Sequence, residues 1–346
     1  MPPSALALSP TDRATLDAKV EFLRQPASYP DATQHVQAVE THMAWVFLTD
    51  TQAYKIKKPI RSGVLDLTTP SARRRSSVLE VQLNRRLAGS VYQGVVRLAQ
   101  REGTLAIGGG GTAVDWLIKM HRLPADRMVD AMALNQSLRP AHLRKTAARL
   151  ARFYQSLPPA LGDPSAYREG LRSTIAANAR TLRLSPYNLP PAQIDSVSRI
   201  LSAFVDDAQA LLEARVLDGH VVEGHGDLRP EHVCLCPDPI IFDCLEFSRA
   251  LRVLDAADEI AFLAMECERL GVRFATSTLF DTYGRAMHDS VPLRLVRFYQ
   301  AHRALERARL AVRHTRTGQT PPKAHAWGAQ ALAYLDHAER LLEEHA

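Results

Sequence analysis

The sequence predicts an α+β fold of two lobes, with a small antiparallel sheet in the N-terminal lobe and a mostly helical C-terminal lobe. Short apolar runs of strand length, separated by turn residues, lie between residues 35 and 121. From residue 140 onward, apolar residues recur mainly at helical spacing. We therefore expect an N-terminal helical extension at 1–30, a first lobe at 31–122 and a second lobe at 123–346.

The first lobe is expected to hold six short strands. A strand pair is expected within 35–48, and single strands at 53–57, 95–98, 104–107 and 113–121. Start signals and helical spacing predict helices at 12–24 and 71–87. The glycines at 108–111 predict a hairpin tip, because no lysine and no helix follow them as a phosphate-binding loop would require.

The second lobe reads as a series of amphipathic helices. They are expected at 140–157, 167–184, 191–216, 257–270, 274–289, 293–314 and 323–344. Proline-containing stretches at 158–164 and 185–191 separate the first three helices.

The composition is that of an ordinary globular protein, with 46% hydrophobic and 23% charged residues. The four cysteines lack paired C-x-x-C spacing, which argues against a zinc site and favours a reducing compartment. No apolar run reaches the roughly 18 residues of a membrane span, and the first residues lack the basic region of a signal peptide. We expect a cytoplasmic protein without a membrane partner.

The net charge of +6 is concentrated in the first lobe, where residues 41–125 hold thirteen Lys and Arg against five Asp and Glu. A basic lobe suits a polyphosphate ligand. Nucleic acid is not an expected partner, because no nucleic-acid-binding motif is present.

The turn-rich stretch 225–247 carries the clearest chemistry. A His-Gly-Asp triplet ends at Asp227, His232 follows five residues later, and Asp243 ends the apolar run 240–242. This order matches the phosphoryl-transfer loop pattern H-R-D-L-x-x-x-N except at the second and last positions. Short strands at 233–235 and 239–242 would bring His232 and Asp243 to neighbouring ends of a hairpin. The pair could then share one Mg²⁺ ion of a bound nucleotide.

At these residues the chain resembles the aminoglycoside phosphotransferase family, the small-molecule branch of the protein-kinase-like fold. It is most similar to uncharacterised bacterial members of that family, some of which carry an extra P-loop ATPase domain. No G-x-x-x-x-G-K-[ST] motif occurs in the chain, so that domain is expected to be absent. The resemblance covers roughly residues 35–315 and implies a protein-kinase-like two-lobed fold.

A second segment, 251–261, resembles the family's G-D-P-x-x-D-L-A sequence. Asp255 and Asp258 stand in its two acidic places. We expect Asp258 to cap a helix or to brace the catalytic loop, a structural role.

The resemblance implies that the γ-phosphoryl group of ATP is transferred to a hydroxyl of a small molecule. Asp227 would accept or orient the hydroxyl proton, and Arg229 would stabilise charge on the moving group. His232 and Asp243 would bind Mg²⁺, or Mn²⁺, which accepts a nitrogen ligand more readily.

The strand at 53–57 ends in Ala-x-Lys, which resembles the end of the kinase V-A-I-K motif. Lys55 and Lys57 should point to the same face of the strand. Lys55 is favoured to meet the α- and β-phosphates, with Lys57 as second candidate and an edge strand with solvated lysines as the alternative. Glu80 would hold the lysine by an ion pair, the alternative being a surface pair with Asn84.

Met120 and His121 stand where the chain leaves the first lobe. They resemble a hinge whose backbone groups would meet the adenine edge.

Two further functions remain open. A nucleotide-binding pseudokinase that acts as a scaffold or sensor is motivated by His232, which replaces an Asn of the pattern. A nucleic-acid binder is supported by charge alone. Protein kinase activity is disfavoured, because only fifteen residues separate Asp243 from Asp258 and leave no room for an activation segment. The sequence identifies neither the hydroxylated substrate nor the oligomeric state; a sugar, amino alcohol or nucleoside fits as well as an aminoglycoside.

Overall fold

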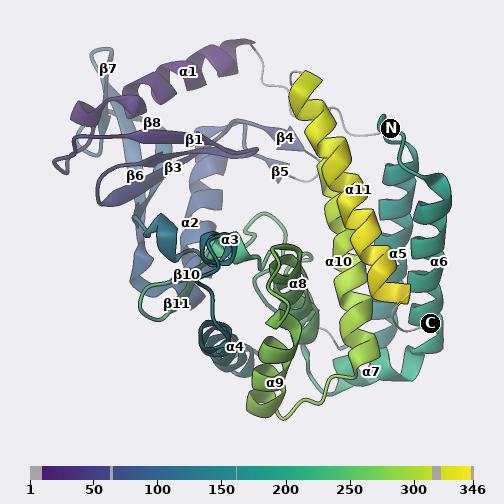
Figure 1. Cartoon of the computed structure of the whole chain (residues 1–346). Coiled ribbons are helices and arrows are strands. Elements are labelled where there is room, and N and C mark those ends of the chain that lie inside the picture. Colours follow the sequence, from purple (N-terminus) through teal and green to yellow (C-terminus); the bar gives the residue numbers. More distant parts are fainter. Residues whose placement is uncertain (1–9, 63–64, 161, 314–320, 344–346) are drawn as a thin grey trace. The chain divides into compact units, whose positions relative to one another are not determined.

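The structure is a computed structural model of the chain and describes residues 10–62, 65–160, 162–313 and 321–343 (Figure 1). Its contacts divide the chain into two compact units. The first unit comprises Met1–Arg127 and Ile240–Ser248, and the second comprises Met128–Pro239 and Arg249–Ala346. The domain boundaries expected at residues 30 and 122 stay predictions. The grouping adds a point that the sequence did not suggest, since residues 240–248 belong with the first unit.

A six-stranded antiparallel sheet with the order β1-β2-β3-β8-β6-β7 forms the centre of the first unit (Figure 1). Its strands are β1 (Gln37–Glu40), β2 (Ala44–Leu48), β3 (Gln52–Lys57), β6 (Tyr92–Arg101), β7 (Thr104–Ile107) and β8 (Thr112–His121). All six correspond to predicted strands, and the glycine run lies between β7 and β8 as expected.

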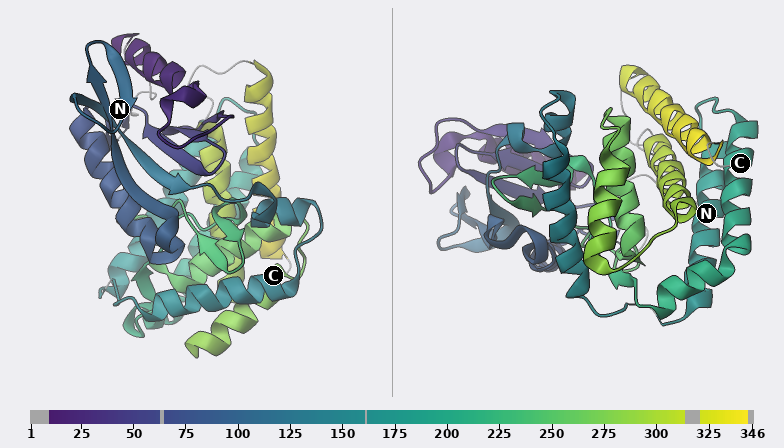
Figure 2. Two further views of the ribbon diagram at one scale, coloured as in Figure 1. Left: turned by 90° about the vertical axis from the view of Figure 1, so that its left-hand side faces the viewer. Right: turned by 60° about the horizontal axis from the view of Figure 1, so that its bottom comes forward.

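Two helices lie on opposite faces of this sheet, α1 (Pro10–Arg24) and α2 (Pro70–Ala88) (Figure 2). On β3, Tyr54 and Ile56 belong to the apolar cluster that α1 covers, whereas Ala53 belongs to the cluster that α2 covers. Because strand side chains alternate, Lys55 and Lys57 must share the face of Ala53 and point toward α2. The N-terminal helix α1 therefore packs on the face of the sheet that carries Tyr54 and Ile56.

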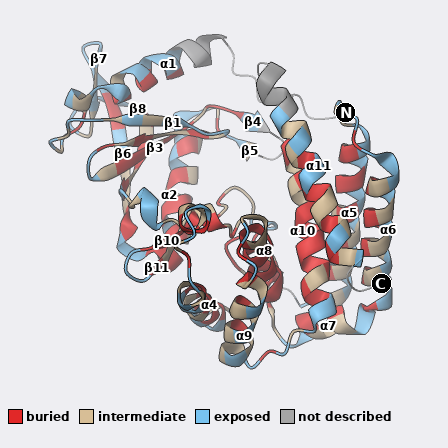
Figure 3. Ribbon diagram, viewed as in Figure 1, coloured by how far each residue is buried: buried red, intermediate tan, exposed pale blue. Residues whose placement is uncertain are grey.

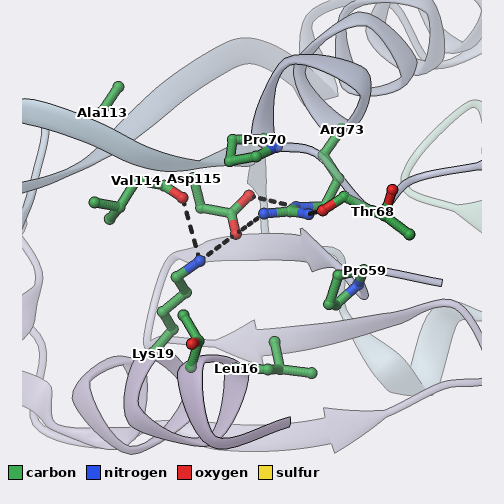
Figure 4. Close-up of a pocket in the computed structure, with 10 residues that line it drawn as sticks. Leu16, Lys19, Pro59, Thr68, Pro70, Arg73, Ala113, Val114 and Asp115 are labelled. Atoms are coloured by element: carbon green, nitrogen blue, oxygen red, sulfur yellow. Dashed lines mark hydrogen bonds and ion pairs between the residues drawn. The ribbon is translucent and has the colours of Figure 1, made fainter. Parts of the chain in front are cut away.

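A buried ionic cluster ties both helices to β8 (Figure 4). Lys19 of α1 donates to Asp115 Oδ2 at 2.7 Å, and Arg73 of α2 donates to both oxygens of Asp115 at 2.8 and 2.7 Å. Arg73 also donates to the carbonyls of Leu67 and Thr68, which fixes the start of α2. All three charged residues are at least nine-tenths buried. Since α2 also carries Glu80, this cluster helps to set the position of that carboxylate.

Short elements complete the first unit. The two-residue strands β4 (Arg61–Ser62) and β5 (Leu65–Asp66) pair with each other and were not predicted. Single 3-10 turns are η1 (Pro26–Ser28), η2 (Gly89–Val91) and η3 (Ala125–Arg127).

The second unit is mostly helical, as predicted. Its helices are α3 (Val129–Leu134), α4 (Pro140–Gln155), α5 (Pro164–Arg183), α6 (Pro191–Asp207), α7 (Gln209–Leu217), α8 (Ala256–Arg269), α9 (Ala275–Met287), α10 (Leu293–Arg313) and α11 (Pro321–Glu343). The single helix expected at 191–216 is wrong, because the chain leaves helical geometry at Ala208, where ψ is 24°. His314 and Glu344, the expected last residues of two helices, lie outside the described residues.

Short strands flank the functional loop, which lies in this unit. β9 (Val221–Glu223) pairs antiparallel with β12 (Val253–Asp255), a pairing that was not predicted. The expected strands β10 (Val233–Leu235) and β11 (Pro239–Ile241) form a two-stranded sheet, preceded by the 3-10 turn η4 (Pro230–His232).

The core of the second unit runs along α5, α6, α8, α10 and α11. Figure 3 shows buried residues along most of α8 and α10. Because α8 is buried nearly all round, its polar residues must find partners inside the protein. Among the described residues, no helix combines the length and the apolar character needed to cross a membrane. The α+β prediction, with its small antiparallel sheet and helical second part, is confirmed.

Candidate functional site

Both lysines of β3 meet one buried carboxylate. Lys55 Nζ lies 2.8 Å from Glu80 Oε1, and Lys57 Nζ lies 2.5 Å from Glu80 Oε2. The two lysines therefore share a face of the strand, as predicted. Glu80 is completely buried, so the alternative reading of a surface pair with Asn84 is wrong. Asn84 is itself buried and its Nδ2 donates to the Glu80 carbonyl at 2.9 Å.

The segment 240–248 adds two more carboxylates to the same lysines. Asp243 Oδ1 accepts from Lys55 at 2.8 Å, and Glu246 Oε1 accepts from Lys57 at 2.5 Å. Burial lowers the pKa of Lys55, but Asp243 and Glu80 outweigh it and hold that pKa well above its ordinary value. Lys55 therefore keeps its positive charge at any physiological pH.

The backbone around Asp243 is held in an unusual shape. Its φ of 62° lies in the left-handed region, which Asp tolerates better than most residues. The N–H of Asp243 donates to the Tyr92 hydroxyl at 3.4 Å, and the N–H of Cys244 donates to Asn84 Oδ1 at 2.9 Å. Backbone strain of this kind persists where the surroundings enforce it and is common at functional sites.

The two hinge candidates lie at the end of β8. Met120 is mostly buried and pairs with Ala53 of β3 and with Tyr92 of β6. His121 pairs with Gln52, and its Nδ1 lies 3.1 Å from Gln93 Nε2. Their proposed contact with adenine stays a prediction.

The catalytic-loop candidates lie together in the second unit. Arg229 Nε is 3.1 Å from Asp227 Oδ1, and Arg229 Nη1 also donates to Glu231. His232 Nδ1 donates to the Asp227 carbonyl at 2.8 Å. Because a carbonyl only accepts, this contact places the ring proton on Nδ1 and leaves a lone pair on Nε2. Arg229 Nη2 lies 3.3 Å from that nitrogen.

Charge keeps Asp227 ionised. Burial raises the pKa of Asp227, but the positive charge of Arg229 beside it opposes this effect, and the pKa lies below its ordinary value. A carboxylate of this kind accepts a hydrogen bond from a hydroxyl and orients it, whereas it holds a full proton only weakly.

Glu259, a buried glutamate whose role was not predicted, holds the backbone of the catalytic loop. Glu259 Oε1 accepts the N–H of His225 at 2.7 Å and the N–H of Gly226 at 2.5 Å, and its Oε2 accepts from the Tyr154 hydroxyl at 2.8 Å. Gly224 makes this approach possible, since a Cβ there would lie 2.6 Å from Glu259 Oε2.

The roles expected of Asp258 are therefore wrong. Asp255 caps α8, by accepting from the Ala257 N–H at 2.8 Å, and Glu259 braces the loop. Asp258 instead makes a two-pronged ion pair with Arg303, at 2.9 and 2.6 Å. The sequence could have indicated Glu259, because the two acidic positions of G-D-P-x-x-D-L-A are four residues apart and Glu259 stands four residues after Asp255.

No family model matches the chain. Two similar proteins, from Mycobacterium tuberculosis and Mycobacterium bovis, are described only as uncharacterized, and each is 30% identical to this chain over 341 residues. The match covers 95% of this chain but only 64% of each relative's length.

Solved structures give the fold. A choline/ethanolamine kinase family protein from Mesorhizobium loti matches with a TM-score of 0.50 and 13% identity, over 95% of this chain and 99% of that one. An amicoumacin kinase in complex with AMP-PNP, Ca²⁺ and Ami matches with a TM-score of 0.51 and 14% identity, over 94% and 93%. A choline kinase from Cryptosporidium parvum matches with a TM-score of 0.51 and 9% identity, over 96% and 97%. The chain has the fold of these small-molecule kinases.

This small-molecule kinase fold confirms the predicted protein-kinase-like architecture. The two residues predicted to bind a divalent ion carry donor atoms of a suitable kind. Asp243 offers hard oxygen ligands, and its side chain is 42% exposed. His232 offers Nε2, with Nδ1 donating to a backbone carbonyl in the manner of ligating histidines, although a metal there and the Arg229 contact exclude each other.

Among the residues that the structure describes, no group of three or more His, Cys, Asp or Glu could hold a metal ion. A nucleotide-bound Mg²⁺ does not require such a group, because it commonly takes one or two carboxylates and completes its shell with phosphates and water.

Proposed function

We propose that the protein is an ATP-dependent phosphotransferase that moves the γ-phosphoryl group to a hydroxyl of a small molecule. The observation that carries the proposal is Lys55 held between a fully buried Glu80 and a partly exposed Asp243. A charged lysine fixed by a glutamate is what a kinase needs to position the α- and β-phosphates. The small-molecule kinase fold supports the same reading.

The first unit supplies the nucleotide-binding residues. Lys55 contacts the phosphates, Glu80 keeps Lys55 in place, and the backbone at Met120 and His121 meets the adenine. Asp243 and His232 would hold Mg²⁺ or Mn²⁺, which when bound neutralises phosphate charge. Lys55 then exchanges its contact with Asp243 for the phosphates while its contact with Glu80 remains.

The second unit supplies the groups that act on the acceptor. Asp227 accepts the hydrogen bond of the substrate hydroxyl and directs the oxygen lone pair toward phosphorus. Arg229, which keeps Asp227 ionised, also stabilises negative charge on the moving phosphoryl group. Positioning and electrostatics supply most of the rate enhancement in such reactions.

The test is ADP formation from ATP with Mg²⁺, measured alone and with pools of sugars, amino alcohols, nucleosides and aminoglycosides. We expect turnover that Asp227→Asn lowers by roughly 10²- to 10⁴-fold, while affinity for a non-hydrolysable ATP analogue changes only a few-fold. Asp238→Asn, an exposed aspartate in the turn after β10, is the matched control and should leave turnover unchanged.

Two outcomes would contradict the proposal. Undiminished turnover in Asp227→Asn would remove this residue from the mechanism. Analogue binding without any turnover that depends on Asp227, across all acceptor pools, would favour the pseudokinase reading.

A further inference from the structure

The second lysine of β3 occupies the buried end of an ionic network. The network joins two lysines, Lys55 and Lys57, with three carboxylates, Glu80, Asp243 and Glu246. Side-chain exposure falls from 42% at Asp243 and 15% at Lys55 to 4% at Lys57 and none at Glu80. A ligand can therefore reach Asp243 and Lys55 much more readily than Lys57.

Lys57 bridges two elements that must stay aligned. Its ammonium lies 2.5 Å from Glu80 Oε2 on α2 and 2.5 Å from Glu246 Oε1 on the segment 240–248. Ser76 of α2 donates to the same Glu246 oxygen at 3.2 Å. Glu246 follows Asp243 by only three residues, so fixing one limits how far the other can move.

The charges show why this lysine is needed once a nucleotide is bound. Bound phosphates would contact Lys55, which would leave Lys57 as the main cationic partner of Glu80 and Glu246. Burial raises the pKa of Glu246, but Lys57 and Lys55 outweigh it and hold that pKa below its ordinary value. Without Lys57, the buried carboxylates of Glu80 and Glu246 would lose the cation that both contact at 2.5 Å, and like charges left unpaired inside a protein repel each other.

We propose that Lys57 is a positioning residue that does not touch the nucleotide. It orients Glu80, which holds Lys55, and together with Glu246 it fixes the segment that carries the metal-binding Asp243. This inference rests on the proposed function, since it concerns the same nucleotide and metal. It assigns Lys57 a different role from the phosphate contact that sequence reasoning gave it as second candidate.

Metal dependence of nucleotide binding separates the two roles. The probe is AMP-PNP, titrated calorimetrically without metal and at increasing Mg²⁺. We expect Lys57→Met to raise the Mg²⁺ concentration for half-maximal tightening by roughly 10- to 100-fold, as loss of a residue that supports a metal ligand does. Metal-free affinity should stay within a few-fold of wild type. Lys55→Met should weaken binding in both conditions.

Three further variants test the positioning role of Lys57. Glu246→Gln keeps the shape of the side chain and should reproduce the metal-specific loss, even if Lys57→Met folds poorly. Lys57→Arg keeps the charge and should restore most of the Mg²⁺ response. Lys58→Met is the matched control, because Lys58 contacts Glu40 and the Thr41 carbonyl instead, and both affinities should be unchanged.

The outcomes distinguish this inference from the proposed function. A wild-type protein that binds no AMP-PNP with or without Mg²⁺ overturns both. Wild-type binding with an equal metal-free loss in Lys57→Met and Lys55→Met overturns only the positioning role, because Lys57 would then contact the nucleotide. A Lys57→Met protein that folds and matches wild type in both titrations also overturns it.

Discussion

Removing the Glu259 carboxylate should destabilise the second unit far more than neutralising it. Glu259→Ala leaves three buried donors without their acceptor, the N–H groups of His225 and Gly226 and the hydroxyl of Tyr154. Glu259→Gln keeps an oxygen for the two N–H groups and turns its amide toward the Tyr154 oxygen, which can accept.

The magnitudes follow from these contacts. An unsatisfied buried donor costs about 1–3 kcal/mol, so the alanine variant should lose roughly 3–6 kcal/mol after partial relaxation. The glutamine variant loses only the charge assistance of the bonds and is relieved of a buried charge, so about 1 kcal/mol is expected. Because whole domains are stable by only about 5–15 kcal/mol, the alanine variant should stand close to unfolding.

The pH dependence of the glutamine variant has a defined sign. Burial, the largest influence, raises the pKa of Glu259 above its ordinary value despite the N–H groups that lower it. The folded state therefore binds this proton more tightly than the unfolded state, which favours folding at low pH. As pH rises from the ordinary Glu pKa of about 4.3 toward the raised folded pKa, the advantage of wild type over Glu259→Gln should shrink.

Urea unfolding of the three proteins, followed by circular dichroism at pH 4.5, 5.5 and 7, measures both effects. If Glu259→Ala is as stable as Glu259→Gln, the loop does not depend on this acceptor. An advantage of wild type over Glu259→Gln that grows with pH would contradict the raised pKa.

Two histidine substitutions give separate tests. If His232 binds the metal through Nε2, wild type should need less Mn²⁺ than Mg²⁺ for half-maximal turnover, and His232→Asn should restore the preference for Mg²⁺; identical metal titrations would refute the ligand assignment. Burial, aided by Arg340 and neighbouring arginines, lowers the pKa of His337 to about 4. Below the ordinary His pKa of about 6.5, the unfolded state therefore binds a proton at His337 that the folded state does not bind, so wild-type stability should fall between pH 7 and 5 more than that of His337→Gln. An equal change of the urea unfolding midpoint in the two proteins between these pH values would contradict this prediction.

Local patterns predicted most of this fold. Alternation on β3 was enough to place Lys55 and Lys57 on one face, and helical spacing was enough to find α2 with Glu80. Elements of two or three residues, such as β9 and β12, are too short to show a period. The break at Ala208 between α6 and α7 has no glycine or proline to announce it.

Non-local pairing explains what was missed at the candidate site. Glu246 was not predicted as part of the site, because nothing in its neighbourhood shows that its partner is Lys57, 189 residues earlier. Glu259 was missed because Asp258 beside it is equally acidic. Only the orientation of α8 decides which of the two faces the loop and which faces Arg303.

The membership of residues 240–248 in the first unit has a consequence for the order of synthesis. Lys57 leaves the ribosome 189 residues before Glu246 does, a delay of roughly 10–40 s at typical bacterial and eukaryotic rates of about 5–20 residues per second. Until Asp243 is made, Glu80 is the only carboxylate of the network in the nascent chain, against two lysines. The nascent first unit cannot complete its ionic network on its own, so its final folding must wait for most of the second unit to be translated.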